Sequence, residues 1–345
     1  MPTIHRNHAN PLLRPGDVRP SQQGMVVECL LNPGAFQHNG ATWLLVRVAE
    51  RPVQQQGKIS FPILEDGDTQ ILEFDLDDPK LDTSDPREPS YDNEVYLSTL
   101  SHLRLFRSTD GVHFEDPGMP NLVGTGPMEN YGIEDCRVST MEDGDFLLTY
   151  SATSPNGVGV GLKRTLDWKD FTDFGMILPP ANKDCAIFES KVGGNYFCFH
   201  RPSGVGLGGN YIWTASSPDL HHWGNHACIA RTRPGKWDSK RIGAGAAPIK
   251  TDRGWLAIYH GADEGNRYCL GALLLDPDDP NCILARSEAP LMEPTEPYEK
   301  EGFFGNVVFT NGHTVDGDTL TLYYGASDTV ICSATLSIPE ILGTL

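Results

Sequence analysis

A repeated strand pattern constrains this chain more than any other feature of its sequence. Five segments begin at a glycine and continue through alternating bulky residues toward an aromatic or polar residue. They are GATWLLVRV (40–48), GDFLLTYSA (144–152), GNYFCFHRP (194–202), GWLAIYHGA (254–262) and GDTLTLYYGA (317–326). Short apolar, aromatic-rich runs that follow a turn signal predict buried β-strands.

The spacing of these strands predicts the architecture. Successive strands lie about 50 to 65 residues apart, which fits a four-stranded sheet with its loops, and the first gap is about twice as long. Segments 103–116, 160–175 and 212–226 each continue from a strand through an acidic turn to Phe or Trp, as hairpins do. We therefore expect an all-β, five-bladed β-propeller, a single domain over residues 1–345 with a rim insertion at about 51–100. The tail SIPEILGTL predicts a short C-terminal helix, and an irregular β-sandwich is the alternative fold.

The charge balance narrows the partners. Lys and Arg number 27 against 46 Asp and Glu, which gives a formal net charge of −19. Such an acidic chain repels phosphate backbones and anionic lipid surfaces, so we expect neither nucleic acid nor a membrane as partner. A cluster of basic residues in this background therefore indicates a specific anion site.

Cysteine spacing and the N-terminal segment bear on metals and on the compartment. Eight cysteines are scattered without a C-x-x-C pair, which does not support a zinc or redox motif, and we expect reduced thiols. The segment MPTIHRNHANPLLRPGDV has no apolar core of a signal peptide, and no run of about 18 apolar residues occurs. The sequence predicts a soluble, cytoplasmic protein with no bound metal.

Polar residues that interrupt the apolar strands are candidates for a site, because burying them without partners is costly. In a propeller, strands from every blade converge on one axis. The candidates in or after the repeated strands are Arg47, His200, Arg201, Tyr259, His260 and Asp328. Three further segments add charged residues: Glu134, Asp135 and Arg137; Lys183, Asp184, Glu189 and Lys191; and Lys240 and Arg241 before a Gly/Ala run. Asp135 beside Arg137 also has a purely structural interpretation, as a salt-bridge partner.

Familiar motifs of other enzymes are absent from the sequence. Neither GAGAAP nor GVGVG has the G-x-G-x-x-G spacing of a dinucleotide site, and no G-x-S-x-G elbow occurs. The adjacent His221 and His222 lack the spacing of a helical zinc pair.

An ordered set of motifs over nearly the whole chain resembles glycoside hydrolase family 130, the β-mannoside phosphorylases and related mannosidases. The motifs are NPGAF (32–36), LLVRV (44–48), SHLRLFRSTDG (101–111), GIEDCRV (132–138), NKDCAIF (182–188), HRP (200–202), SPDLHHWG (217–224), GWLAIYHGAD (254–263), YCLGALLLD (268–276), GFFGNVVFTNG (302–312) and YYGASD (323–328). The resemblance implies a five-bladed propeller and an inverting mechanism, in which one Asp is the sole protein acid and acts through a hydroxyl of the bound mannose. That Asp falls on Asp135, and Cys136 stands where the family usually has Pro.

The resemblance also implies roles for other residues. Those expected to bind phosphate are Lys183, Arg201, Arg241 and His260, with Tyr268 nearby. Those expected to contact the sugar are Asn32, Arg47, Asp263 and Asp328, and Glu134 joins them beside the acid. Glu189 departs from the family pattern and places an additional carboxylate near the substrate.

Three hypotheses follow. The leading one is an inverting phosphorylase that forms α-mannose 1-phosphate from short β-mannosides, with inorganic phosphate as co-substrate and no metal or organic cofactor. A phosphate nucleophile requires one protein acid and a cationic pocket, whereas an inverting hydrolase requires a second carboxylate as base. The second hypothesis is therefore a β-mannosidase that uses Asp135 with Glu189 or Glu264. The third is a non-catalytic glycan-binding propeller. The linkage and the chain length of the mannoside stay open, and the resemblance allows a homo-oligomer.

Overall fold

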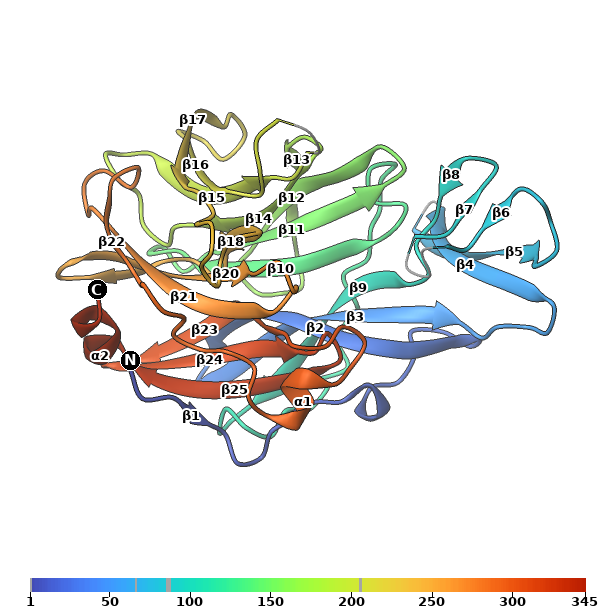
Figure 1. Cartoon of the computed structure of the whole chain (residues 1–345), viewed down its shortest axis with the longest axis horizontal. Coiled ribbons are helices and arrows are strands. Elements are labelled where there is room, and N and C mark those ends of the chain that lie inside the picture. Colours follow the sequence, from blue (N-terminus) through green and yellow to red (C-terminus); the bar gives the residue numbers. More distant parts are fainter. Residues whose placement is uncertain (1, 66, 85–87, 205–206) are drawn as a thin grey trace.

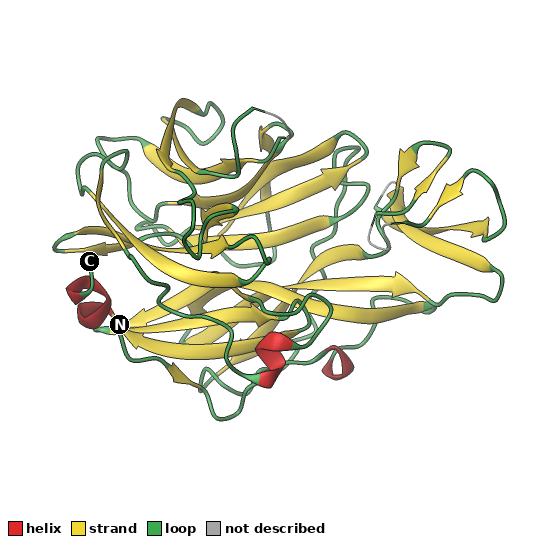
Figure 2. Ribbon diagram, in the orientation of Figure 1, coloured by secondary structure: helices red, strands yellow, loops and turns green. Residues whose placement is uncertain are grey.

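The computed structural model describes residues 2–65, 67–84, 88–204 and 207–345. The fold is all-β with few helices, and most strands belong to five antiparallel sheets that follow one another along the chain (Figures 1 and 2). The first contains β2 (Met25–His38), β3 (Ala41–Pro52) and β9 (Leu100–Ser108). The second contains β10 (Ile133–Thr140), β11 (Phe146–Ser154), β12 (Gly157–Thr165) and β13 (Thr172–Leu178). The third contains β14 (Asn182–Ile187), β15 (Tyr196–Pro202), β16 (Ile212–Ser217) and β17 (Gly224–Ala230).

The last two sheets complete the series. The fourth contains β18 (Arg241–Ala244), β20 (Gly254–Ala262), β21 (Tyr268–Leu275) and β22 (Ile283–Arg286), with β19 (Ile249–Thr251) also paired to β20. The fifth contains β23 (Val308–Asp316), β24 (Thr319–Ala326) and β25 (Val330–Ser337), and the N-terminal β1 (His5–Arg6) pairs with β25. The helices are short: the 3₁₀ turn η1 (Pro15–Asp17), α1 (Pro297–Lys300) and α2 (Ile338–Gly343).

The five repeated segments are confirmed as strands, and each lies inside its sheet, paired with a neighbouring strand on both sides. They correspond to β3, β11, β15, β20 and β24, and the expected bounds 254–262 of β20 match those observed. The C-terminal helix is also confirmed, as α2. The sequence located these strands because each is a short apolar run that follows a turn.

Hydrophobic clusters join each sheet to the next. Leu45 of the first sheet packs in one cluster with Ile133 of the second. Further clusters lie between the second and third, the third and fourth, and the fourth and fifth sheets. The cluster that contains Leu44 and Ile331 joins the fifth sheet back to the first. We call β2, β10, β14, β18 and β23 the leading strands of the five sheets. Among them, β2 contacts β23 and β10, β10 contacts β14, and β14 contacts β18.

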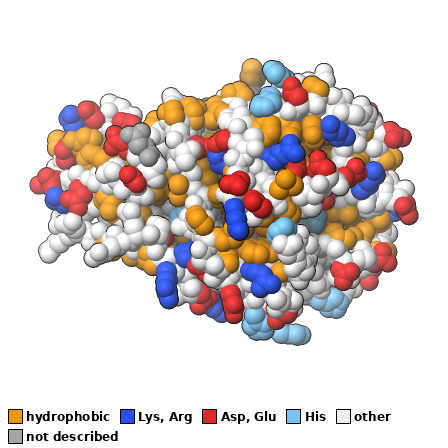
Figure 3. Space-filling model, turned by 180° about the vertical axis from the view of Figure 1, so that it is seen from behind, with side chains coloured by type: hydrophobic (Ala, Val, Ile, Leu, Met, Phe, Trp, Pro, Cys, Tyr) orange, Lys and Arg blue, Asp and Glu red, His pale blue; other side chains and the backbone are white. Residues whose placement is uncertain are grey.

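The segment between β3 and β9 forms two small sheets of its own. It contains the hairpin β4 (Lys58–Glu65) and β5 (Asp68–Asp75), followed by β6 (Leu81–Asp82), β7 (Ser90–Tyr91) and β8 (Glu94–Val95). These strands project from one side of the molecule, and the same projection is visible from behind in the space-filling view, where acidic and basic side chains are interspersed (Figures 1 and 3). The expected bounds 51–100 overlap the neighbouring strands, because β3 continues to Pro52 and β9 begins at Leu100.

No helix in the described part of the chain combines the length and the hydrophobicity needed to span a bilayer. Among the same residues, no group of three or more His, Cys, Asp and Glu is placed to hold a metal ion.

Candidate active site

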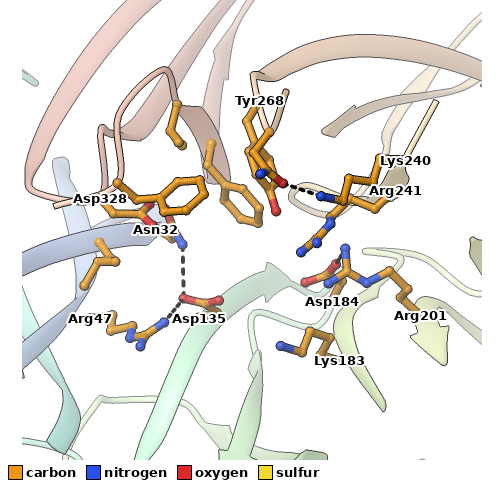
Figure 4. Close-up of a pocket in the computed structure, with 15 residues that line it drawn as sticks. Asn32, Arg47, Asp135, Lys183, Asp184, Arg201, Lys240, Arg241, Tyr268 and Asp328 are labelled. Atoms are coloured by element: carbon orange, nitrogen blue, oxygen red, sulfur yellow. Dashed lines mark hydrogen bonds and ion pairs between the residues drawn. The ribbon is translucent and has the colours of Figure 1, made fainter. Parts of the chain in front are cut away.

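A cavity of about 410 Å³ opens where the leading strands of the sheets meet (Figure 4). Its volume lies in the range of pockets that enclose small ligands. The lining residues are Leu31, Asn32, Arg47, Asp135, Lys183, Asp184, Arg201, Lys240, Arg241, Asn266, Tyr268, Phe304, Val307, Phe309 and Asp328.

Three of the lining residues reach the cavity from β-bulges. The register of the strand pairing shifts between Leu31 and Gly34 in β2, between Glu134 and Arg137 in β10, and between Lys183 and Ala186 in β14. Within these shifts Asn32, Asp135 and Asp184 have φ of +37°, +49° and +54°. A bulge bends its strand and redirects a side chain. Three bulges therefore direct the side chains of Asn32, Asp135 and Asp184 into the same cavity.

Asp135 is held by two donors from the first sheet. Its Oδ1 accepts hydrogen bonds from Asn32 Nδ2 at 3.1 Å and from Arg47 Nη1 at 3.0 Å. Arg47 Nη2 also pairs with Glu134 Oε1 at 2.8 Å, and its Nε donates to Ser101 Oγ at 2.9 Å. The guanidinium of Arg47 therefore positions the carboxylate and neutralises part of its charge.

The electrostatic surroundings shift the pKa values of the neighbouring Asp135 and Glu134 in opposite directions. Burial opposes ionisation of Asp135, but the positive charges of Arg47 and Arg137 outweigh it and lower the pKa of Asp135. Burial raises the pKa of Glu134, although Arg47 opposes this shift. Arg137 does not bond the carboxylate of Asp135 and instead donates from Nη1 to its backbone oxygen at 2.9 Å.

Asp184 has three charged or imidazole partners. Its Oδ1 lies 3.1 Å from Arg137 Nη2, and its Oδ2 lies 2.9 Å from Arg201 Nη1 and 3.3 Å from His260 Nε2. Burial opposes its ionisation, yet Arg201, His260 and Arg137 hold the pKa of Asp184 well below its usual range. Burial lowers the pKa of His260 to about 4, although Asp184 favours its charged form.

The part of the cavity across from Asn32 and Arg47 is cationic. Figure 4 shows Lys183, Arg201, Lys240 and Arg241 gathered there. Lys240 Nζ donates to Asn266 Oδ1 at 2.8 Å, and the guanidinium carbon of Arg241 lies 5.9 Å from the centroid of the Tyr268 ring. The lining contains five Lys and Arg side chains and three carboxylates, an excess of positive charge in a chain whose net charge is −19. This arrangement suits an anion bound beside a sugar-sized space.

Known proteins with a similar sequence or structure point to one family. The model of glycoside hydrolase family 130, described as β-1,4-mannooligosaccharide phosphorylase, matches residues 90–345. A β-1,2-mannobiose phosphorylase from Listeria innocua is 42% identical over 349 residues, which cover 99% of this chain and 98% of that protein. A 1,2-β-oligomannan phosphorylase from Thermoanaerobacter is 37% identical over 251 residues, which cover 71% of this chain and 82% of that protein.

A solved structure agrees with the sequence matches. The Listeria innocua β-1,2-mannobiose phosphorylase in complex with β-1,2-mannobiose superposes with a TM-score of 0.94 over 99% of both chains, at 42% identity. The chain belongs to glycoside hydrolase family 130.

The structure of this family 130 member brings most of the predicted site residues together. Eight of them line the cavity: Asn32, Arg47, Asp135, Lys183, Arg201, Arg241, Tyr268 and Asp328. Two others contact lining residues: Glu134 pairs with Arg47, and His260 contacts Asp184 and Arg201.

Two predicted residues do not line the cavity, and these expectations need correction. Glu189 lies beyond the end of β14, exposed, where its Oε1 accepts a hydrogen bond from the backbone of Thr140 at 2.9 Å. Asp263 stabilises the turn after β20 by accepting from Gly265 N at 2.9 Å and pairing with Arg267. The sequence could not separate these residues from the cavity, because a few residues along a strand decide which end of the sheet a side chain reaches.

Several lining residues were given no role from the sequence. They are Leu31, Asp184, Lys240, Asn266, Phe304, Val307 and Phe309. The sequence indicated the two charged ones only as candidates beside Lys183 and Arg241. The aromatic residues lie in the motif GFFGNVVFTNG (302–312), whose apolar character alone predicts core rather than cavity.

Proposed function

We propose that this enzyme is an inverting β-mannoside phosphorylase that converts a short β-manno-oligosaccharide and phosphate into α-mannose 1-phosphate and a shortened sugar. β-1,2-Mannobiose is the substrate of choice, because two relatives, which match 99% and 71% of this chain, are named for β-1,2-linked mannosides. The observation that carries the proposal is one cavity that combines the carboxylate of Asp135 with a cationic wall.

The two parts of the cavity suit the two reactants. Asn32, Arg47 and Asp328 lie on the side of Asp135 and offer donors and acceptors to mannose hydroxyls. Lys183, Arg201 and Arg241 lie on the other side and offer charge-assisted hydrogen bonds to phosphate. His260, which contacts Arg201, supports this group from behind.

The reaction is a single displacement. A phosphate oxygen attacks the anomeric carbon, the glycosidic C–O bond breaks, and the departing oxygen receives a proton that originates on Asp135 and passes through a mannose hydroxyl. The new bond forms on the face opposite the broken one, so a β-mannoside yields the α-phosphate. Bound phosphate also offsets the positive charge of Lys183 that helps to lower the pKa of Asp135, and thus favours the protonated acid.

A hydrolytic mechanism is the second candidate, and the positions of the carboxylates do not support it. An inverting hydrolase needs a base for water on the side opposite the acid. Neither Glu189 nor Glu264 lines the cavity. Asp184 is already bound by Arg137, Arg201 and His260, and Asp328 lies on the same side of the cavity as Asp135 (Figure 4), so neither is placed as a base opposite the acid.

Fold and context are part of the same proposal. The five sheets form a five-bladed β-propeller and a single catalytic domain over residues 1–345, supported by the hydrophobic clusters that join each sheet to the next and the last to the first. Phosphate is the co-substrate and no cofactor takes part. The enzyme acts in the cytoplasm, where phosphate is abundant, and a homo-oligomer is compatible with this arrangement.

The decisive experiment measures cleavage of β-1,2-mannobiose with and without phosphate. The proposal expects saturable phosphate dependence, α-mannose 1-phosphate as product, and turnover in reverse from that ester and mannose. Equal release of mannose in both buffers would establish the hydrolase instead. Binding of mannobiose without any cleavage would establish the non-catalytic alternative. Glu189→Gln is the accompanying control, with turnover expected within about twofold of wild type because this side chain lies outside the cavity.

A further inference from the structure

Asp184 occupies the centre of a buried polar group that no assigned role explains. It is 2% exposed, and its two oxygens together contact Arg137, Arg201 and His260. Arg201 lies on β15 and His260 on β20, so one carboxylate connects β14 with three other strands. A buried carboxylate is stable only with such partners, and here the partners include a residue expected to bind phosphate.

The backbone of β18 packs closely against this carboxylate. The backbone of Gly243, in β18, lies against the contact between Asp184 and His260. A Cβ at position 243 would lie 2.2 Å from Asp184 Oδ2 and 2.5 Å from His260 Nε2. Both distances are shorter than any van der Waals contact, so glycine is required there.

Arg137 extends the group toward the acid. Its guanidinium donates to the backbone oxygens of Asp135 at 2.9 Å, Ala244 at 3.0 Å and Gly245 at 3.1 Å, in addition to Asp184. Arg137 is 1% exposed and therefore has no alternative hydration. A single guanidinium thus ties the bulge of Asp135 to the bulge of Asp184 and to the segment that follows β18.

A carboxylate in an anion site has two opposite effects on phosphate. Its negative charge weakens the Coulombic attraction for phosphate. Its hydrogen bond from Arg137, its ion pair with Arg201 and its contact with His260 hold these side chains in place, and that ordering lowers the cost of binding phosphate. The close contacts on both oxygens and the absence of space at Gly243 indicate that the second effect dominates.

We propose that Asp184 is the positioning residue of the phosphate site, holding Arg201 and His260 for phosphate and, through Arg137, fixing their placement relative to Asp135. This inference rests on the proposed phosphorylase function and deepens it. Asp184 does not touch the reacting atoms in this role, since its oxygens are taken by its three partners.

The first test is Asp184→Asn. An amide has one oxygen and one NH₂ group, so its nitrogen must face either Arg137 or Arg201, both of which are donors. We expect the KM for phosphate, and the Kd of inorganic phosphate by calorimetry, to rise roughly 10- to 100-fold, as when supporting ligand contacts are removed. The KM for β-1,2-mannobiose should stay within about threefold, because Asn32 and Arg47 are untouched. A mere charge effect predicts tighter phosphate binding, so an unchanged or lower phosphate KM overturns the inference.

Gly243→Ala is the second variant, because it displaces Asp184 and His260 without changing any charge. The same selective loss of phosphate affinity is expected. Asp145→Asn is the matched control, since Asp145 is also a buried carboxylate paired with an arginine, Arg164. It adjoins Phe146, which pairs with Thr140 at the end of β10 away from Asp135. Asp145→Asn should lower the stability of the protein without altering its phosphate affinity. If Asp145→Asn lowers phosphate affinity as much as Asp184→Asn does, the assignment is contradicted.

The wild-type measurements separate the two proposals. If the wild type binds phosphate but releases only free mannose, the phosphorylase function fails while the phosphate affinities of both variants still decide the role of Asp184. If the wild type binds no phosphate, both proposals fail together. If it phosphorolyses mannobiose and both variants keep its phosphate affinity, only the positioning role fails.

Discussion

Replacement of Asp135 by Asn tests the proposed acid with little disturbance of the fold. The two donors on Asp135, Asn32 Nδ2 and Arg47 Nη1, both bond to Oδ1. The amide oxygen of Asn can accept both hydrogen bonds, and its NH₂ group then occupies the position of Oδ2. Arg47 keeps Glu134 as an ionic partner at 2.8 Å, so its positive charge is not left uncompensated.

The expected magnitude follows from what is kept and what is lost. The retained hydrogen bonds limit the change in the free energy of unfolding to about 1 kcal/mol. Loss of the only proton donor should reduce kcat by roughly 10²- to 10⁴-fold, the usual contribution of general acid catalysis. At 1.36 kcal/mol per decade this corresponds to about 2.7 to 5.4 kcal/mol of activation free energy.

The assay follows formation of α-mannose 1-phosphate from β-1,2-mannobiose at saturating phosphate, together with mannobiose binding by calorimetry. Binding should remain within a few-fold of wild type while turnover falls, since the loss concerns the transition state. Asp145→Asn, which makes the same substitution at a buried carboxylate outside the cavity, should retain turnover. A kcat for Asp135→Asn within about fivefold of wild type would refute the assignment of the acid.

Three further predictions concern phosphate binding, packing and acid stability. Arg241→Met should raise the KM for phosphate about 10-fold or more in initial-rate measurements at fixed mannobiose, because it removes a charge-assisted donor, and an unchanged KM would exclude Arg241 from the site. Gly312→Ala should lower the free energy of unfolding by about 1 to 3 kcal/mol in denaturant titrations, because the new Cβ would lie 2.2 Å from Ala35 N. An unchanged free energy of unfolding would mean that β23 and β2 can move apart without cost. Acidification from pH 7 to pH 5 should reduce stability by up to about 2 kcal/mol for each of three buried histidines, because the unfolded state binds protons near pH 6.5 whereas burial lowers the folded pKa to about 4. These histidines are His102, His200 and His260. The loss of stability begins as the pH falls below 6.5 and is complete below 4, and it should be smaller in a variant in which one of the three is replaced.

The sequence was sufficient to locate the strands, because their pattern is local. Each repeated strand is apolar along its length and follows a glycine turn, so its position does not depend on distant residues. The strand over 254–262 is the clearest case, with every residue buried. The insertion was also visible, as an acidic, proline-rich interruption of the repeat.

Pairing within the site could not be predicted in the same way. The neighbouring Asp135 and Arg137 suggested a salt bridge, but a bulge separates their directions, and Asp135 pairs with Arg47 from another sheet. Arg137 pairs instead with Asp184. Such contacts depend on how sheets pack, and nothing in the local pattern of either segment encodes that geometry. Glu189 shows the converse, because a carboxylate close to Asp184 in the chain lies at the other end of its strand.

The backbone itself argues that the cavity residues are present for their side chains. Some hairpin turns of this chain place glycine in the left-handed region, as at Gly144 with φ of +88° and Gly317 with φ of +55°, and others place Asn or Asp there, as at Asn39 with φ of +50° and Asp92 with φ of +52°. At the three bulges of the cavity it has Asn32, Asp135 and Asp184 in the same region of φ, at a cost of about 1 kcal/mol each relative to glycine. Glycine would stabilise the bulge but provide no polar group. Asn and Asp tolerate this conformation better than other residues with a side chain, and at all three bulges the polar group lines the cavity, which points to a role in the chemistry of the cavity.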